Sequence, residues 1–400
     1  MRRGFIAAMQ HKLLIATPFN SGRIVLIAIA VTMDGRRSPR KSKNHNNKRS
    51  AISAHWKNIC RVVPCIAVLL TLLASTAASA QTFCVYDPMG AAGDYMTMFK
   101  DYQLEAKRWK INIDLVTYTD DDKMIQAFEG GHCAMASMIG FRAVKYNMFT
   151  GTIDTPSTIE NYVEMRDLLH LIASPRLAQY MTSDPYEVVG VLPLGAGYVI
   201  VNDRKINTVS AATGKKVVIP KFDKGLSLVV TGINAKPVPE DLLNYGKAFA
   251  DVDILMIPLV LYKPLEVERT VIKTNGGIVR RPLFELTVQI VSYHDKFPAA
   301  FGQQSREYIG RQADRTLGLA HNLENSIDNR FWIYVKRGDL DIWNTTMRNI
   351  SNEMVKQGYI DKRMLGLLRR IRCKSTPDEP ECRTINEQKP TTTSQPTTSP

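Results

Sequence analysis

The stretch Phe83-Cys-Val-Tyr-Asp-Pro-Met-Gly-Ala-Ala-Gly-Asp94 opens an α/β pattern, because a short apolar run ends there at a turn of small residues. The run at residues 83–86 predicts a buried strand. Apolar residues then recur at three- and four-residue steps between Tyr95 and Trp109, with charged residues on the other face. This spacing predicts a helix, so the stretch opens a strand–helix–strand unit.

The same pattern continues as far as Arg142. Residues 111–117 alternate between apolar and polar side chains, as in a strand with one buried face. The acidic run at residues 120–122 suits the positive end of a helix, which Gly130-Gly131 ends before a third strand at residues 132–137. Crossover helices predict a parallel sheet in the order 2-1-3, with ligands beyond the carboxyl ends of its strands. Those ends are residues 87–93, 118–122 and 137–142.

A second α/β unit follows with different residues. Strands are predicted at residues 216–220, 237–239 and 253–258, with helices between them, the second at 240–249. Two longer strand-like runs, at residues 188–201 and 283–293, suit strands that cross from one lobe to the other. Further helical regions are predicted at residues 158–181, 297–323, 340–357 and 361–372. The fold class is therefore α/β with two lobes and C-terminal helices.

A net charge of +14 is typical of a protein that binds nucleic acid, but most of this charge lies in the N-terminal region. Residues 1–80 hold 13 of the 52 Lys and Arg and only one of the 38 acids, which leaves 39 bases against 37 acids beyond them. The remaining chain therefore carries only +2, and we expect no nucleic-acid partner. With 44% hydrophobic residues, 400 residues suffice for two lobes with real cores.

The N-terminal region ends like a secretory signal. Residues 55–61 form a weakly basic segment, residues 62–73 an apolar one, and Ala78-Ser-Ala80 a cleavage site before Gln81. An uncleaved anchor is the rival interpretation, but the apolar part is short for a bilayer span. We predict export to the periplasm with cleavage after Ala80.

These patterns predict a division of the chain into six segments. They are a disordered leader, or a segment from a wrongly chosen upstream start codon, at 1–54, a signal peptide at 55–80, the first part of lobe I at 81–188, lobe II at 189–285, a return to lobe I with the C-terminal helices at 286–382, and a disordered tail at 383–400.

Four cysteines remain in the predicted mature chain, and an exported compartment permits disulfides. Four cysteines allow three connectivities. We prefer Cys84 with Cys133, because these residues lie at the same level of neighbouring strands, and Cys373 with Cys382, which would close a short loop. Zinc is the competing interpretation, but the sequence has no C-x-x-C and its histidines lack ligand spacing, so no metal or cofactor is expected.

Three short motifs carry a resemblance to a known family. They are Thr213-Gly-Lys-Lys-Val-Val-Ile-Pro220, Gly232-Ile-Asn-Ala-Lys-Pro-Val-Pro239 and Asp251-Val-Asp253. The chain resembles, over residues 81–358, the extracytoplasmic solute-binding proteins of TRAP-type transporters. It is also similar to the AdeT-like solute-binding proteins associated with RND-type efflux. The resemblance implies a two-lobe clamp of the periplasmic-binding-protein type II class, which delivers a small molecule to membrane transporter subunits and is a monomer.

One departure from the TRAP family concerns the ligand. The strand arginine that typically pairs with a substrate carboxylate in that family falls at Val218, which forms no ion pair. Lys221 or Arg142 would have to substitute, although neither occupies the motif position. The resemblance therefore leaves the charge of the solute open.

The clamp mechanism places the ligand between the lobes, with the crossing strands as hinges. The candidate ligand-binding residues lie at strand ends: Asp87, Met89, Gly93, Ser137, Met138, Arg142, Lys221, Phe222, Asp223 and Tyr262. Each has a structural alternative: Asp87 caps a turn, the methionines pack, Arg142 pairs with a carboxylate, and Lys221 and Asp223 form a solvated turn. The aromatic pair at 222 and 262 suits the walls of a ligand site.

Two other function classes remain to be weighed. The sequence contains no G-x-S-x-G, G-x-x-x-x-G-K-[ST], G-x-G-x-x-G or H-E-x-x-H motif, which disfavours an enzyme. An efflux-associated adaptor that keeps the clamp fold without a cargo is the alternative. Stabilisation by a small molecule would separate the two, since only a solute-binding protein gains stability from its ligand.

Overall fold

The structure is a computed structural model that describes residues 80–87, 94–379 and 381–383. The predicted leader at 1–54, almost all of the predicted signal peptide and the predicted tail beyond residue 383 lie outside these ranges. The candidate residues Met89 and Gly93 also lie outside them.

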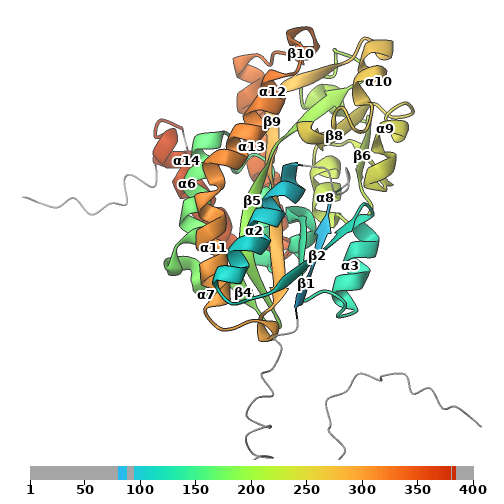
Figure 1. The fold of residues 1–400 in the computed structure, drawn as a ribbon. Helices are drawn as coiled ribbons and strands as arrows, with labels where there is room; N and C mark the ends of the chain where they lie inside the picture. The colour runs from blue at the N-terminus through green and yellow to red at the C-terminus, as the bar shows by residue number, and fades with distance from the viewer. Residues whose placement is uncertain (1–79, 88–93, 380, 384–400) are drawn as a thin grey trace, which may run out of the picture. The chain divides into compact units, whose positions relative to one another are not determined.

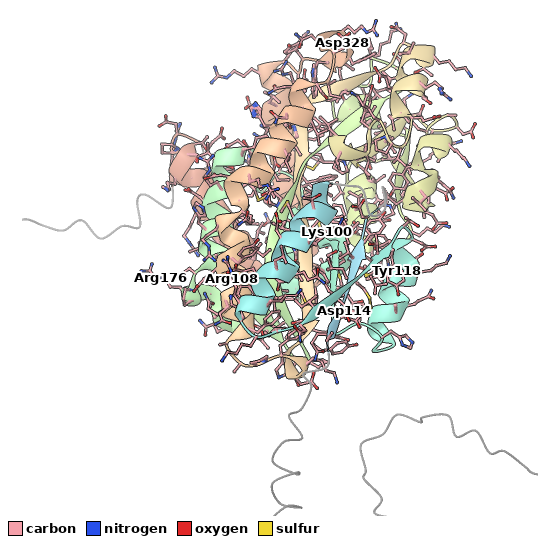
Figure 2. All side chains as sticks on the ribbon, in the orientation of Figure 1. Lys100, Arg108, Asp114, Tyr118, Arg176 and Asp328 are labelled. Atoms are coloured by element: carbon pink, nitrogen blue, oxygen red, sulfur yellow. A yellow bond between two sulfur atoms is a disulfide. The ribbon has the colours of Figure 1, made fainter. Side chains whose placement is uncertain are left out.

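The first lobe is built on three parallel strands in the predicted order. β1 (Gln81–Tyr86) lies between β2 (Ile113–Tyr118) and β3 (Met135–Ile139). Helix α2 (Asp94–Arg108) connects the first two strands, and its charged residues Lys100 and Arg108 are exposed (Figure 2). Helix α3 (Asp121–Glu129) follows β2 and is capped by Asp120, whose side chain accepts from the Lys123 N–H. The acidic start of this helix confirms the predicted match to the helix dipole.

The second lobe repeats this arrangement with β6 (Lys216–Pro220), β7 (Lys236–Glu240) and β8 (Ile254–Pro258), all parallel. Helix α8 (Lys224–Gly232) joins the first two of these strands, and α10 (Val267–Thr274) follows β8. The helix predicted at 240–249 is wrong in length. β7 takes Glu240 to pair with Pro220, and only a 3-10 turn and α9 (Tyr245–Ala248) follow.

Two long antiparallel strands carry both lobes in one sheet. β5 (Tyr186–Val201) and β9 (Gly277–Tyr293) pair along most of their length, and β9 contacts β3 while β5 contacts β8 (Figure 1). The sheet order is β2-β1-β3-β9-β5-β8-β6-β7. β9 begins six residues before the predicted start, because Pro282 interrupts the apolar pattern; the ladder shifts register beside it, between Gly197 and Tyr198.

Helices from the C-terminal part cover this sheet. α6 (Tyr162–Ala173) packs with α11 (Phe301–Arg311), α12 (Ala313–Asn325) and α14 (Lys362–Ser375), and α13 (Arg337–Lys356) packs on α8. The single helix predicted at 297–323 is wrong, since the chain turns at Gln312. The two pieces serve different cores: Ile309 packs with Phe83, whereas Leu317 packs with Leu168.

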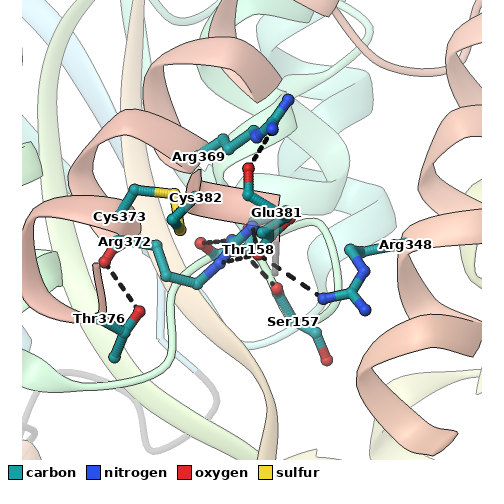
Figure 3. Close-up of a disulfide and its surroundings, with 9 residues drawn as sticks. All are labelled: Ser157, Thr158, Arg348, Arg369, Arg372, Cys373, Thr376, Glu381 and Cys382. Atoms are coloured by element: carbon teal, nitrogen blue, oxygen red, sulfur yellow. Dashed lines mark hydrogen bonds and ion pairs between the residues drawn. A yellow bond between two sulfur atoms is a disulfide. The ribbon is translucent and has the colours of Figure 1, made fainter. Parts of the chain in front are cut away.

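Both preferred disulfides are confirmed. Cys84 and Cys133 are joined with a Cα–Cα distance of 5.8 Å, and Cys373 and Cys382 with one of 5.2 Å. The first bond ties the strand β1 to the segment that enters β3, inside the core of the first lobe. The second closes the loop after α14 (Figure 3).

The C-terminal loop places one carboxylate among three arginines. Arg372 donates to Glu381 Oε1 from Nε (2.9 Å) and Nη2 (2.6 Å), and Arg348 of α13 lies 3.8 Å from the same oxygen (Figure 3). Arg369 donates to the Glu381 carbonyl. The buried Arg372 also donates to the Thr158 carbonyl at 2.7 Å, so this cluster ties the chain end to the segment before α6.

We predict that Glu381→Gln lowers the free energy of unfolding by about 3 kcal/mol, because Arg372 stays buried without its counter-ion. Urea unfolding of the mature protein measures the change. Glu379→Gln is the matched control, since the described hydrogen bonds of that residue are made by its backbone. Equal stability of the two variants would contradict a structural role for the carboxylate.

Candidate functional site

Arg142 reaches from the first lobe towards the second. It lies in the short helix α4 (Gly140–Ala143), directly after β3. Its Nε donates to Asp121 Oδ2 at 2.6 Å and its Nη2 to Asp122, both in the first turn of α3. Carboxylates of its own lobe thus hold the predicted cationic candidate through two of its guanidinium nitrogens.

Phe222 meets this guanidinium from the second lobe. It lies in the turn between β6 and α8, and its ring centroid is 3.5 Å from Arg142 Cζ. A guanidinium over an aromatic face is a favourable cation–π contact. The neighbouring Lys221 pairs with Asp241 at 2.7 Å, beyond the end of β7. In the turn after β6, Phe222 therefore contacts the first lobe, whereas Lys221 pairs within its own lobe.

These residues border a cavity of about 570 Å³, which we call the interlobe cavity. The first lobe contributes residues at the carboxyl ends of β1, β2 and β3: Tyr86, Asp120, Asp121, Asp122, Lys123, Gln126 and Arg142. The second lobe contributes residues that follow β6 and end or follow β7: Lys221, Phe222, Glu240, Asp241, Leu242, Leu243 and Asn244. Its volume is in the range of sites for small molecules.

A second, mostly apolar cavity of about 220 Å³ lies on Phe222 as well. Met354, Leu226 and Val229 line it together with the buried Asp154 and the half-buried Asp223. Asp223 caps α8 by accepting from the Leu226 N–H at 2.8 Å, and burial raises its pKa to about 6. The candidate Asp223 thus borders this smaller cavity and is absent from the lining of the interlobe cavity.

The structure places the other described candidates away from the lining of the interlobe cavity. Asp87 is buried at the end of β1, where its backbone N–H donates to the Tyr118 carbonyl at 3.0 Å. Ser137 and Met138 are buried within β3, the methionine in the core of the first lobe. Tyr262 is buried in the core of the second lobe. The interlobe cavity therefore brings together three of the ten candidates, Arg142, Lys221 and Phe222.

The ten predicted ligand-binding residues include none of the five carboxylates that line the cavity. Asp121 and Asp122 lie at a strand end that the topology had indicated, but they were interpreted as helix-capping residues. Glu240 ends β7 and Asp241 follows it, but the sequence pattern was interpreted there as the start of a helix. The rule that ligands gather beyond the carboxyl ends of parallel strands applies equally to both pairs, and it would have selected them.

Val218 lies away from the cavity. It is fully buried in β6 and packs in the core of the second lobe with Tyr245 and Leu255. Arg142 is the only arginine among the described residues that line the interlobe cavity. In residues 80–87, 94–379 and 381–383 no group of three His, Cys, Asp or Glu side chains is placed to hold a metal ion. No described helix has both the length and the apolar character needed to cross a membrane.

The two lobes, the crossing strands and the cavity between strand ends define a solute-binding protein of the type II clamp class. The model of the family "Solute-binding protein AdeT 1/2" matches residues 103–387, and the chain belongs to this family. It is 33% identical over 300 residues to the probable solute-binding protein AdeT1 of Acinetobacter baumannii, covering 74% of this chain and 98% of that one. The probable solute-binding protein AdeT2 of the same organism is 25% identical over 226 residues, covering 56% of this chain and 94% of that one.

Solved structures of TRAP periplasmic solute-binding proteins share the fold. One from Desulfovibrio salexigens with bound orotic acid has a TM-score of 0.61 at 10% identity, and one from Haemophilus influenzae with bound L-gulonate has 0.59 at 12%. They cover 74% and 73% of this chain and 99% of their own. Membership in this family implies binding of a small-molecule solute.

Asp154 makes stability depend on pH. It is fully buried and accepts from Thr287 Oγ1 (2.6 Å) and the Thr287 N–H (3.1 Å), and burial raises its pKa to about 8. A Cβ on Gly140 would lie 2.2 Å from its Oδ2, so only glycine fits there. At pH values between the ordinary carboxyl pKa and this raised value, the folded state therefore binds more protons than the unfolded state.

We predict that the free energy of unfolding falls as the pH rises from about 4 to about 8, with Asp154 contributing up to about 1.4 kcal/mol per pH unit. Asp154→Asn should remove that part of the slope, because the amide does not titrate. Urea unfolding at several pH values measures it, with the exposed Asp114→Asn on β2 as the control (Figure 2). An unchanged slope in Asp154→Asn would show that Asp154 is ionised throughout this range.

Proposed function

We propose that this protein captures a small-molecule solute in the interlobe cavity and delivers it to a TRAP-like membrane transporter. The observation that carries the proposal is the contact of Arg142 with Phe222, at 3.5 Å, across a cavity lined by both lobes. A ligand that touches both lobes favours the closed arrangement over an open one, and the transporter partner then recognises the closed form.

The hinge of this clamp is formed by the crossing strands. β5 and β9 shift register at four places, among them the steps from Val188 to Gly190 and from Pro193 to Gly195. Gly195 has a φ of +109°, a conformation that other residues rarely adopt. Irregular pairing weakens the ladder locally, so these positions are where we place the bending between lobe I (81–188 and 286–382) and lobe II (189–285).

The predicted signal peptide completes the proposal. Cleavage after Ala80 would release a chain that starts with β1 at Gln81, so removal of residues 55–80 would leave the first strand intact. We expect the protein exported from its own signal to begin at Gln81 and to act as a monomer. Native mass spectrometry tests both points and also detects a bound solute as an adduct that denaturation removes.

We predict that Phe222→Ala weakens solute-induced closure, because it removes the only ring that Arg142 contacts across the cavity in the described structure. Small-angle scattering with and without the co-purified solute measures the decrease in radius of gyration. Tyr334→Ala is the matched control, since the Arg280 Cζ lies 5.2 Å from that exposed ring, outside the cavity.

Compaction of the wild type and of Tyr334→Ala, but reduced compaction of Phe222→Ala, is the expected result. Equal compaction of the wild type and both variants would show that closure does not depend on the Arg142–Phe222 contact. A wild-type protein that carries no adduct and is neither stabilised nor compacted by a broad solute panel would favour an adaptor role instead.

A further inference from the structure

The charges around the interlobe cavity do not balance. Five carboxylates line it, at Asp120, Asp121, Asp122, Glu240 and Asp241, against three basic side chains. With every group in its ordinary charge state, the lining carries a net charge of 3 − 5 = −2. Both lobes contribute acids, so the excess negative charge faces the cavity from two sides.

The basic side chains are already engaged by these acids. Arg142 is held by two carboxylates and covered on one face by Phe222, as described above. Lys221 pairs with Asp241 at 2.7 Å and lies 4.0 Å from Glu240, and Lys123 lies 3.5 Å from Asp120. A ligand carboxylate would have to compete with protein carboxylates for each of these cations.

Two buried polar atoms of the lining lack a partner. Asp121 Oδ1 and the Tyr86 hydroxyl are buried and accept or donate no hydrogen bond among the described residues. The Asp121 side chain is only 10% exposed, and its other oxygen already binds Arg142. Leaving a buried acceptor unsatisfied costs free energy, which a ligand donor would recover. Burial also raises the pKa of Asp121, as expected for a carboxylate whose charge is incompletely compensated.

We infer that the solute of the interlobe cavity is a cation bearing amino groups, and that it is not a carboxylate. An ammonium group donates three hydrogen bonds and carries the charge that the lining lacks. The Tyr86 ring, the Phe222 ring and the side chains of Leu242 and Leu243 provide apolar surface for the carbon skeleton of such a ligand. The inference rests on the proposed function, since it specifies the ligand class of the same cavity.

The test compares amines with carboxylates as probes of the mature protein. Spermidine and 1,6-diaminohexane represent the amines, and malonate and glucuronate the carboxylates. Isothermal titration calorimetry at about 50 mM and about 500 mM NaCl measures each dissociation constant, because added salt screens charge–charge attraction. We expect the amines to bind, more weakly at high salt, and the carboxylates to give no saturable binding.

A double variant locates the binding site. Asp122→Asn with Asp241→Asn removes one carboxylate from each lobe; these side chains are 60% and 47% exposed, so the fold should persist. We expect the double variant to raise the dissociation constant for the amines at least about tenfold. This factor corresponds to the loss of one charge-assisted hydrogen bond. Asp114→Asn with Asp251→Asn is the matched control, because it removes the same charge from exposed positions outside the cavity.

The outcomes separate this inference from the proposed function. Amine binding that is lost in the cavity variant and kept in the control supports the inference. Amine binding that is equal in both variants, or absent in the wild type, overturns it. Carboxylates that bind and compact the protein would also overturn it, while leaving the proposed capture of a solute intact. Absence of any ligand-dependent stabilisation or compaction would count against both.

Discussion

The antiparallel pairing of β5 with β9 is the constraint on which the rest of the structure depends. These two strands place the parallel sets β2-β1-β3 and β8-β6-β7 at opposite ends of one sheet. The carboxyl ends of both sets then line one cavity, although their residues lie about a hundred positions apart in the chain. Because both lobes share this ladder, we expect the strands themselves to bend at their register shifts when the clamp closes.

Burial of carboxyl groups is the second organising feature. Asp154 accepts two hydrogen bonds from Thr287 of β9, which joins the segment after α5 (Met148–Gly151) to a crossing strand. Glu285, on the same strand, is also buried, and burial raises its pKa. Groups of this kind are costly to keep charged, so the protein holds protons that the unfolded chain would release. We therefore expect the stability of the fold to depend on pH through these two carboxyl groups.

The cavity combines a shared fold with an acidic lining. The relatives of known structure establish the two-lobe architecture at about a tenth sequence identity, which says nothing about the ligand. The lining residues have to be considered individually, and here the acids outnumber the bases. The core position of Val218 and the engagement of Arg142 by Asp121 and Asp122 both point away from carboxylate recognition.

Periodicity and turn residues depend on neighbours in the chain, so the sequence alone predicted local elements such as the strand β6. The strand order 2-1-3 and the pairing of Cys84 with Cys133 were also predicted correctly. The sequence also selected Arg142, Lys221 and Phe222, because strand ends are visible in a sequence. Only the tertiary structure decided that Ser137, Met138 and Tyr262 are buried and that Asp121 and Asp241 line the cavity. The direction in which a residue at a strand end points depends on packing between distant segments, which no local pattern records.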